Sequence, residues 1–283
     1  MKKKYLLLFG LLLNNITYSQ IIKSRLIDKD DDLPIQYATI INKSNSNFTF
    51  SDENGNFEIS TNYADSLMVT HTSYNVTIFN VNDIKSNQIY LTKKINLLDE
   101  VLVHKKPHIT LNLEKNNGIT YYGLSLDREY ALFVESTYNA AEKVYFHKLI
   151  IPVEFKKKYS SDGLLSVSII EADQNNNISD NIIVDPVYID IGKVKNNKLE
   201  IVFPKIVFLP QNNYFLVFKR ILTNQQFNKK DNNLSVNPFI YSRKSNIEKL
   251  LYIRSIFNDK WLEVNKNNYP YTPVFSYELI TLK

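Results

Sequence analysis

The sequence has 283 residues, 44% of them hydrophobic, which is enough for two domains with substantial cores and argues against disorder. Its formal net charge of +5 falls to about +2 without three N-terminal lysines, so the chain lacks the basic excess of a nucleic-acid-binding protein. The absence of cysteine excludes disulfides, thiolate metal sites, a cysteine nucleophile and a lipid-modified N-terminal cysteine. With 19 tyrosines, 16 phenylalanines and only 6 glycines, the composition favours sheets over helices.

Residues 1–19 have the pattern of an export signal that is removed from the mature protein. Three lysines, Lys2 to Lys4, precede an apolar run over residues 5–13 that is too short to span a bilayer. Thr17 and Ser19 place small side chains at positions −3 and −1 of a cut before Gln20. No later stretch is apolar enough for a transmembrane helix. We therefore expect an exported protein that is periplasmic, outer-membrane-associated or extracellular.

From residue 20 to about residue 97 the sequence alternates short β-type runs with turn residues. Phe50 and Phe57 belong to two such runs, and Asn54-Gly55 between them is a strong hairpin signal. About seven strands are expected in fewer than 80 residues, which predicts a β-sandwich.

Four stretches in this region follow one another in a characteristic order: 34–40 (PIQYATI), 51–59 (SDENGNFEI), 65–74 and 89–103. In order and spacing they resemble the carboxypeptidase-regulatory-like domain, in the version common in envelope proteins of Bacteroidetes-type bacteria. The resemblance covers residues 21–103 and implies a seven-stranded, transthyretin-like β-sandwich with no activity of its own. The sequence departs from the family at Ser73, where a glycine usually precedes the tyrosine.

The segment Asp99 to Val103 resembles the part of outer-membrane TonB-driven receptors that contacts the energy-transducing protein. The 180 residues that follow are too few for the barrel of such a receptor. We therefore predict that this segment is a last strand or a connector.

A boundary between two modules is predicted at 104–118, where charge, Pro107 and the turn Asn116-Asn117-Gly118 interrupt the apolar pattern. Residues 119–283 show about ten β-type runs and no convincing helix, which predicts a larger, jelly-roll-like β-sandwich. Leu199, Ile201 and Phe203 alternate along the chain with Lys198, Glu200 and Val202. The first three should therefore face the core of this sandwich. The expected strands are 119–126, 130–136, 144–155, 164–171, 182–191, 198–202, 214–221, 250–257, 261–264 and 274–282.

The sequence has four histidines: His71, His104, His108 and His147. His104 and His108 have the spacing of one helix face, but Pro107 breaks such a helix, so a solvated linker is predicted there and no metal site. His71 alternates with Val69 and is expected to pack as a strand residue rather than to act as a base.

No motif implies a cofactor. The glycines form no phosphate loop or dinucleotide fingerprint, and Gly123 to Asp127 lacks the final glycine of a nucleophile elbow. The cluster Asp28 with Asp30 to Asp32 offers oxygen ligands for Ca²⁺, yet it lacks the spacing of an EF-hand loop and is interpreted as a solvated loop.

Four aromatic residues are candidates for stacking on sugar rings: Trp261, Tyr252, Tyr269 and Tyr271. The alternative is that they belong to the core or to strand edges, because large aromatic side chains dominate β-sandwich cores.

These features favour an exported, non-enzymatic binding or scaffolding protein of the cell envelope, whose partner is a protein or a glycan. Two alternatives stay open: an envelope hydrolase acting on polysaccharide or peptide through the second module, and an accessory component of an outer-membrane uptake system. No catalytic residue, metal ligand or cofactor is assigned from the sequence.

Overall fold

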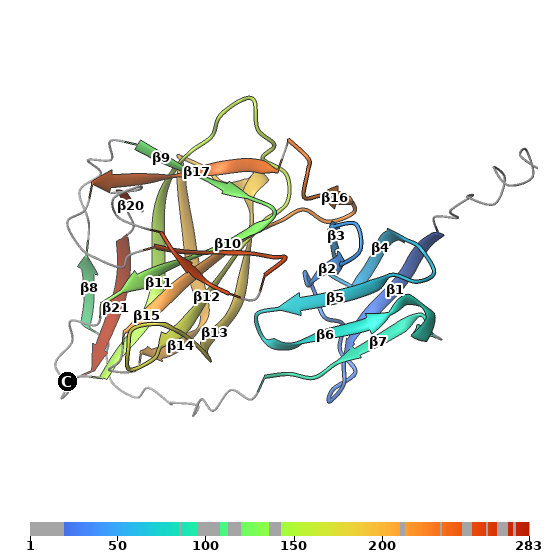
Figure 1. The fold of residues 1–283 in the computed structure, drawn as a ribbon. Helices are drawn as coiled ribbons and strands as arrows, with labels where there is room; N and C mark the ends of the chain where they lie inside the picture. Colours follow the sequence, from blue (N-terminus) through green and yellow to red (C-terminus); the bar gives the residue numbers. More distant parts are fainter. Residues whose placement is uncertain are drawn as a thin grey trace, which may run out of the picture.

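The computed structural model describes residues 20–84, 86–94, 108–112, 120–135, 143–209, 213–232, 234–244, 251–258, 260–264, 271–273 and 276–282. These residues form strands and two short 3-10 helices, so the predicted all-β class is confirmed. Two bodies lie side by side, a smaller one built from the N-terminal third and a larger one built from the rest (Figure 1). In the part of the chain that is described, no helix is long and apolar enough to cross a membrane.

The first module pairs a three-stranded sheet, in the order β4-β1-β7, with a five-stranded sheet, in the order β16-β3-β2-β5-β6. Its own strands are β1 (Gln20–Asp28), β2 (Thr39–Asn42), β3 (Asn47–Phe50), β4 (Asn56–Thr61), β5 (Ser66–His71), β6 (Tyr74–Asn80) and β7 (Gln88–Leu91), with the helix η2 (Val81–Asp83) between the last two. Alternate residues such as Ile40, Phe57 and Val69 form the core between the sheets.

The predicted hairpin turn at Asn54-Gly55 is present. Gly55 has a φ of +77°, and a Cβ at this position would lie 2.6 Å from the carbonyl oxygen of Leu26, so only glycine fits. The Asp52 carboxylate accepts hydrogen bonds from the backbone N–H groups of Asn54 and Asn56, which closes the turn.

The second module is a larger sandwich of a six-stranded sheet, in the order β13-β12-β15-β10-β18-β19, and a seven-stranded sheet. The second sheet has the path β20-β17-β11-β21-β8, with β14 paired to β11 and β9 paired to β17. The strands are β8 (His108–Asn112), β9 (Thr120–Ser125), β10 (Arg128–Val134), β11 (Lys143–Glu154), β12 (Leu164–Ala172), β13 (Ile178–Asp190), β14 (Lys198–Leu209), β15 (Tyr214–Ile221), β17 (Ser235–Lys244), β18 (Leu251–Ser255), β19 (Leu262–Glu263), β20 (Tyr271–Pro273) and β21 (Ser276–Leu282), with the helix η3 (Ile191–Lys193) before β14.

The period-two alternation predicted for β14 is confirmed, because Leu199, Ile201 and Phe203 are all buried in the core between the two sheets. The central strand β15 is buried along its whole length. Tyr214, Leu216 and Phe218 face this core. Phe215 and Val217, which lie between them, are buried in a separate hydrophobic cluster on the outer face of the sheet.

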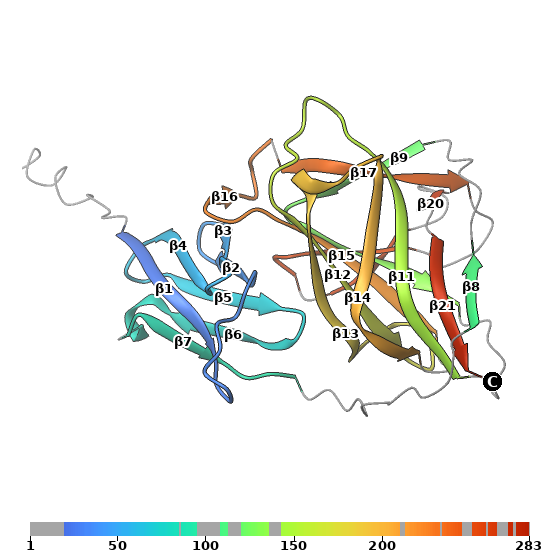
Figure 2. The ribbon, with the colours of Figure 1, turned by 180° about the vertical axis from the view of Figure 1, so that it is seen from behind.

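The two modules share a hydrophobic core. The outer face of the five-stranded sheet contributes Ile41, Phe48, Phe50 and Met68, which pack against residues from one end of the second sandwich. Those residues are Leu126, Ile221, Leu222, Leu234, Val236 and Ile256. The first module therefore caps the end of the second sandwich (Figure 2).

A short strand of the second module, β16 (Phe227–Asn228), crosses over and pairs with β3 as an edge strand of the first module's sheet. Phe227 lies opposite Phe48, and their rings are 5.4 Å apart. Asn228 also donates from its side chain to the carbonyl oxygen of Asn45. The two modules are thus joined by backbone pairing as well as by apolar contact.

The structure has strands that were not predicted from the sequence, among them β16, β20 and the following two. Strand β8 lies inside the interval 104–118 that was predicted as a linker, so the second module begins there and not after residue 118. Strand β17 was not predicted because Pro238 interrupts its pattern; its pairing with β9 skips from Val236 to Phe239. Residues 95–107 and 113–119, which hold the rest of the predicted boundary, lie outside the described residues.

Candidate functional site

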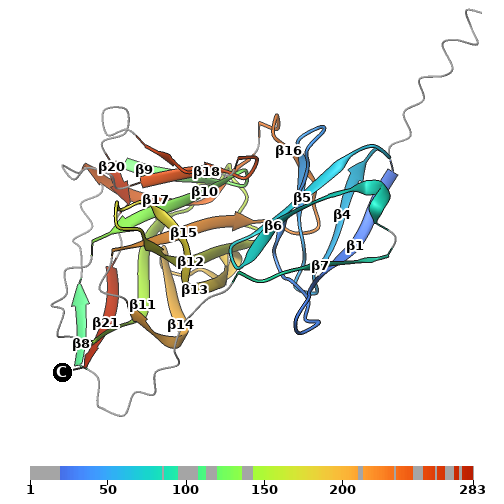
Figure 3. The ribbon, with the colours of Figure 1, turned by 60° about the horizontal axis from the view of Figure 1, so that its bottom comes forward.

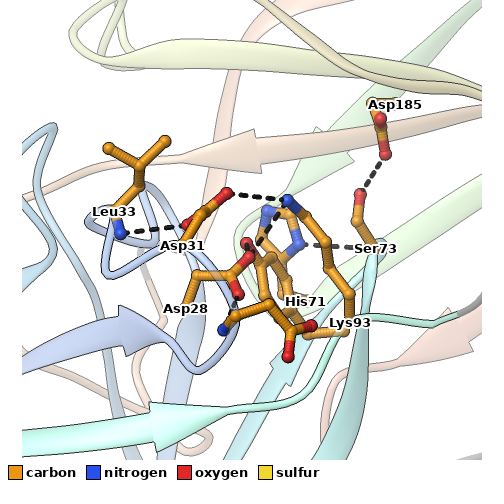
Figure 4. A network of polar contacts seen from close by, with 9 residues as sticks. Asp28, Asp31, Leu33, His71, Ser73, Lys93 and Asp185 are labelled. Atoms are coloured by element: carbon orange, nitrogen blue, oxygen red, sulfur yellow. Dashed lines mark hydrogen bonds and ion pairs between the residues drawn. The ribbon is translucent and has the colours of Figure 1, made fainter.

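The β5–β6 hairpin points at the second module (Figure 3). Polar side chains from the two modules meet at this hairpin. The hydroxyl of Ser73 donates to the Asp185 carboxylate over 2.6 Å, and a ring nitrogen of His71 lies 3.1 Å from the hydroxyl of Tyr188. Figure 4 shows Ser73 between His71 and Asp185. The hydroxyl of Ser73 thus forms a hydrogen bond between the two modules.

His71 is a packed histidine, as the sequence predicts, and it is not arranged to activate a nucleophile. Its Nδ1 accepts the backbone N–H of Ser73 at 3.1 Å, so the proton of the neutral ring is on Nε2 and points at Tyr188. Burial of the ring, with the Lys219 ammonium as a second cause, lowers the pKa of His71 to about 3. The Ser73 hydroxyl is engaged with Asp185, so the serine and the histidine do not form a catalytic pair.

The acidic cluster near residue 28 is occupied by a lysine (Figure 4). The Asp28 carboxylate is fully buried; it accepts from the Tyr74 hydroxyl at 2.7 Å and lies 3.0 Å from the Lys93 ammonium. Lys93 also lies 3.4 Å from Asp31. Burial alone would raise the pKa of Asp28, but the hydrogen bonds from Tyr74, Asp30 and Lys93 lower it below its ordinary value. This cluster closes a loop, and the Lys93 ammonium pairs with two of its carboxylates, Asp28 and Asp31.

A second charged cluster lies on the outer face of the six-stranded sheet. Glu129, 5% exposed, receives two hydrogen bonds from Arg254 and lies 3.4 Å from the Lys219 ammonium. Burial would raise the pKa of Glu129, but Arg254 and Lys219 lower it to about 2. One carboxylate thus faces two cations beside the module interface, where Lys219 also faces the ring of Phe50.

Arg220 is a buried polar group that the sequence did not single out. It is fully buried and donates to the backbone carbonyls of Asn237, Leu164 and Asp162. The Asn237 side chain in turn bonds the backbone of Lys156. This network fixes the loop before β12, and each of the three guanidinium nitrogens of Arg220 donates to a backbone carbonyl.

A polar groove opens between β13 and β14, which belong to different sheets of the second module. Its volume is about 660 Å³, within the range of small-ligand sites. Its polar lining includes Asp190, Lys193, Lys195, Lys198 and Glu200. The groove is therefore rich in hydrogen-bond donors and acceptors that face solvent.

The two carboxylates in this groove are each paired with a lysine. Lys193 lies 3.0 Å from Asp190, and Lys148 lies 2.9 Å from Glu200. Both lysines hold the pKa of the neighbouring carboxyl below its ordinary value. Neither carboxyl is therefore poised to remain protonated and act as a general acid.

The aromatic candidates do not gather at one place. Tyr252 is 6% exposed and packs edge-to-face on Phe215, so its ring belongs to the outer-face core. Trp261 is half-buried against the same cluster, and the Arg254 guanidinium lies 4.5 Å above its ring. Tyr271 lies on β20 in the other sheet, and Tyr269 lies outside the described residues. Tyr252 and Trp261 are also at the opposite edge of the six-stranded sheet from the groove.

Comparison with known proteins gives no family. No protein-family model matches the chain, and no curated protein matches it. One weakly similar structure holds the cysteine protease and lectin-like domains of Cwp84, a surface layer associated protein of Clostridium difficile; it is 11% identical with a TM-score of 0.35 and covers 54% of this chain and 32% of that chain. A second, the clostridial cysteine protease Cwp84 after propeptide cleavage, is 9% identical with a TM-score of 0.38 and covers 93% of this chain and 71% of that chain. This chain thus spans about a third of the length of the first, and likenesses at this level support no functional argument.

Proposed function

We propose that the protein is an exported, non-enzymatic binding or scaffolding protein of the cell envelope, with a protein or glycan partner, and that the groove between β13 and β14 holds the ligand. The observation that carries this proposal is the contrast between two kinds of polar site. The buried clusters are engaged in internal contacts, whereas the groove presents charged side chains to solvent.

The groove has the chemistry of a site for a polar, extended ligand. Lysine ammonium groups donate, the Asp190 and Glu200 carboxylates accept, and the apolar parts of Val187, Ile189 and Val202 line the same groove. A glycan or an extended peptide offers matching hydroxyl or amide groups along its length. Binding rather than hydrolysis is favoured because both carboxyls are held ionised by lysines.

The fused architecture suits a scaffold. The shared core around Phe48 and the pairing of β16 with β3 hold the two modules in one arrangement, so a partner bound to one module is presented at a fixed position relative to the other. The proposal of export rests on residues 1–19 and predicts a mature N-terminus at Gln20, which N-terminal sequencing of the protein from the native envelope would test.

A binding experiment tests the groove directly. Residues 20–283 would be applied to a glycan array and to envelope polysaccharides, beside the variants Lys195→Glu and Lys157→Glu. Lys195 lines the groove, whereas Lys157 is an equally charged, exposed residue elsewhere. We expect saturable binding whose affinity falls at least about tenfold in Lys195→Glu and is unchanged in Lys157→Glu. A tenfold fall in affinity corresponds to about 1.4 kcal/mol of binding free energy.

A further variant, Trp261→Ala, separates the groove from the aromatic candidates. Loss of glycan binding in this variant alone would place the ligand at Trp261 and contradict the groove. Absence of binding to any glycan would leave a protein partner, to be sought by cross-linking in the native envelope.

A further inference from the structure

Strand β6 is an unprotected edge of the first module's five-stranded sheet. It stands last in the order β16-β3-β2-β5-β6, and residues 74–80 contain no charge and no proline. Val76 and Ile78 are 50% and 53% exposed on this strand. Natural edge strands usually carry charges, prolines or bulges that prevent pairing with another chain. Strand β6 carries an extra residue near positions 75–76, where its register with β5 shifts, but residues 77–80 have none of these devices, which indicates that pairing of this part is tolerated or used.

Only the second half of β6 is open. At its start, the N–H of Asn75 donates to the carbonyl of Thr92, and the N–H of Lys94 donates to the carbonyl of Ser73. The N–H of Val81 donates to the carbonyl of Asp65, so in the same register Phe79 and Thr77 are the residues that hydrogen-bond to β5, and Ile78 and Asn80 direct their peptide groups to the outer side. Within the described residues, the backbone groups of Ile78 and Asn80 on this side have no backbone partner.

The exposed side chains continue the interface between the modules. Cross-strand register places Phe48, Ile41, Met68 and Ile78 in one row on the outer face of the sheet. The first three are buried against the second module, but Ile78 at the end of the row is half exposed. The open edge thus extends an apolar surface that is already an interface over most of its length.

We propose that β6 pairs with β6 of a second copy of this chain, antiparallel, about a two-fold axis through Ile78. This pairing goes beyond the proposed ligand binding. Ile78 of each copy exchanges two backbone hydrogen bonds with Ile78 of the other, with the two Cα atoms about 5.5 Å apart, and the two Ile78 side chains lie side by side on the outer face. Val76 of each copy then lies opposite Asn80 of the other. The free stretch 76–80 is centred on Ile78, so this register is the one that uses all of it.

The second copy is favoured over an unrelated peptide because the edge is self-complementary. In this register the outward backbone groups of Ile78 pair with those of its own equivalent, which also covers the exposed Ile78 side chain. A two-fold contact also closes on itself, so it gives a dimer and not a fibre. The two five-stranded sheets would become one continuous sheet across the dimer.

Sedimentation of residues 20–283 over a range of concentrations tests the proposal with the variants Ile78→Lys and Val202→Lys. Val202 is a matched control, since it is β-branched, 54% exposed and on the strand β14. We expect a concentration-dependent dimer for the unchanged protein and for Val202→Lys. Ile78→Lys should be monomeric, because it places two like charges directly opposite each other. Thermal unfolding would check that both variants remain folded.

A cross-linking experiment identifies the register. The chain has no cysteine, so Ile78→Cys introduces a single thiol that should form an intermolecular disulfide under mild oxidation. Val202→Cys should remain monomeric under the same conditions. A monomeric protein at all concentrations, a dimer that survives Ile78→Lys, or equal cross-linking by both cysteine variants would overturn the proposal.

Discussion

The shared core between the modules makes a sharp prediction for Phe48. This side chain is fully buried, and its ring lies within 6 Å of the rings of Phe50, Phe227 and Phe257. Replacing it with alanine removes most of these contacts and should cost about 3–5 kcal/mol of unfolding free energy. At this chain length that corresponds to a fall of roughly 6–20 °C in Tm.

The assay compares two probes of unfolding in urea. The fluorescence of Trp261, the one tryptophan of the sequence, reports on the second module, while far-ultraviolet circular dichroism reports on both. The two transitions should coincide in the unchanged protein, because the shared core couples the modules. They should separate in Phe48→Ala. The control is Phe57→Ala, which removes the same side chain from the first module's own core and should shift both probes together.

A loss of less than about 1 kcal/mol of unfolding free energy in Phe48→Ala would be smaller than that of an ordinary core truncation. It would contradict a stabilising role for the shared core. Coincident transitions in that variant would refute it as well. Either result would show that the modules touch without stabilising each other.

Three further predictions concern single groups. The free energy of unfolding should fall as the pH drops below 6.5 toward 3, because the folded pKa of His71 is lowered to about 3 and the unfolded chain binds the proton first. In urea titrations at several pH values, His71→Gln should show a smaller dependence of this free energy on pH. Glu129→Gln should cost about 3–5 kcal/mol near neutral pH by leaving the buried Lys219 ammonium poorly compensated. Since the folded pKa of Glu129 is lowered to about 2, its contribution is present above 4.5 and disappears toward pH 2, and an unchanged acid limb in the variant would contradict this. Gly163→Ala should cost at least about 2 kcal/mol, since φ is +83° and a Cβ would lie 2.2 Å from the carbonyl oxygen of Ile221; a urea midpoint equal to that of the unchanged protein would show that the turn adapts.

Features set by local chemistry were predictable from the sequence. The all-β class followed from composition and alternation, and the turn at Gly55 followed from the Asn-Gly pair. The inward face of β14 followed from its period of two. In each case the determining residues are neighbours in the chain, so the pattern contains the information.

The docking of the modules was missed, although the sequence contains a signal for it. Ile40 and Ile41 are consecutive in the sequence and both buried, and the three consecutive residues Leu67, Met68 and Val69 are buried as well. A strand that is apolar on both faces indicates a sheet that is covered on both sides. The cover itself and the strand β16 come from residues about 180 positions later, and no local pattern connects them.

The candidate site was the least predictable part. Tyr252 was chosen as a stacking residue by type, but its ring packs against Phe215 on the outer face of the sheet, where it is buried. The groove arises because β13 and β14 belong to different sheets and separate from each other, which depends on the tertiary packing alone. The lysines at 193, 195 and 198 were visible in the sequence as a cluster in a turn, without any indication that a groove lies beside them.

The central claim is that this protein binds its partner without transforming it. The most direct measurement incubates residues 20–283 with a glycan or peptide identified as a ligand, and follows both saturation by calorimetry and the ligand's mass over many hours. We predict saturable binding that Lys195→Glu weakens, with the ligand recovered unchanged. Time-dependent cleavage of the ligand that is lost in Glu200→Gln or Asp190→Asn would contradict the account and establish a hydrolase.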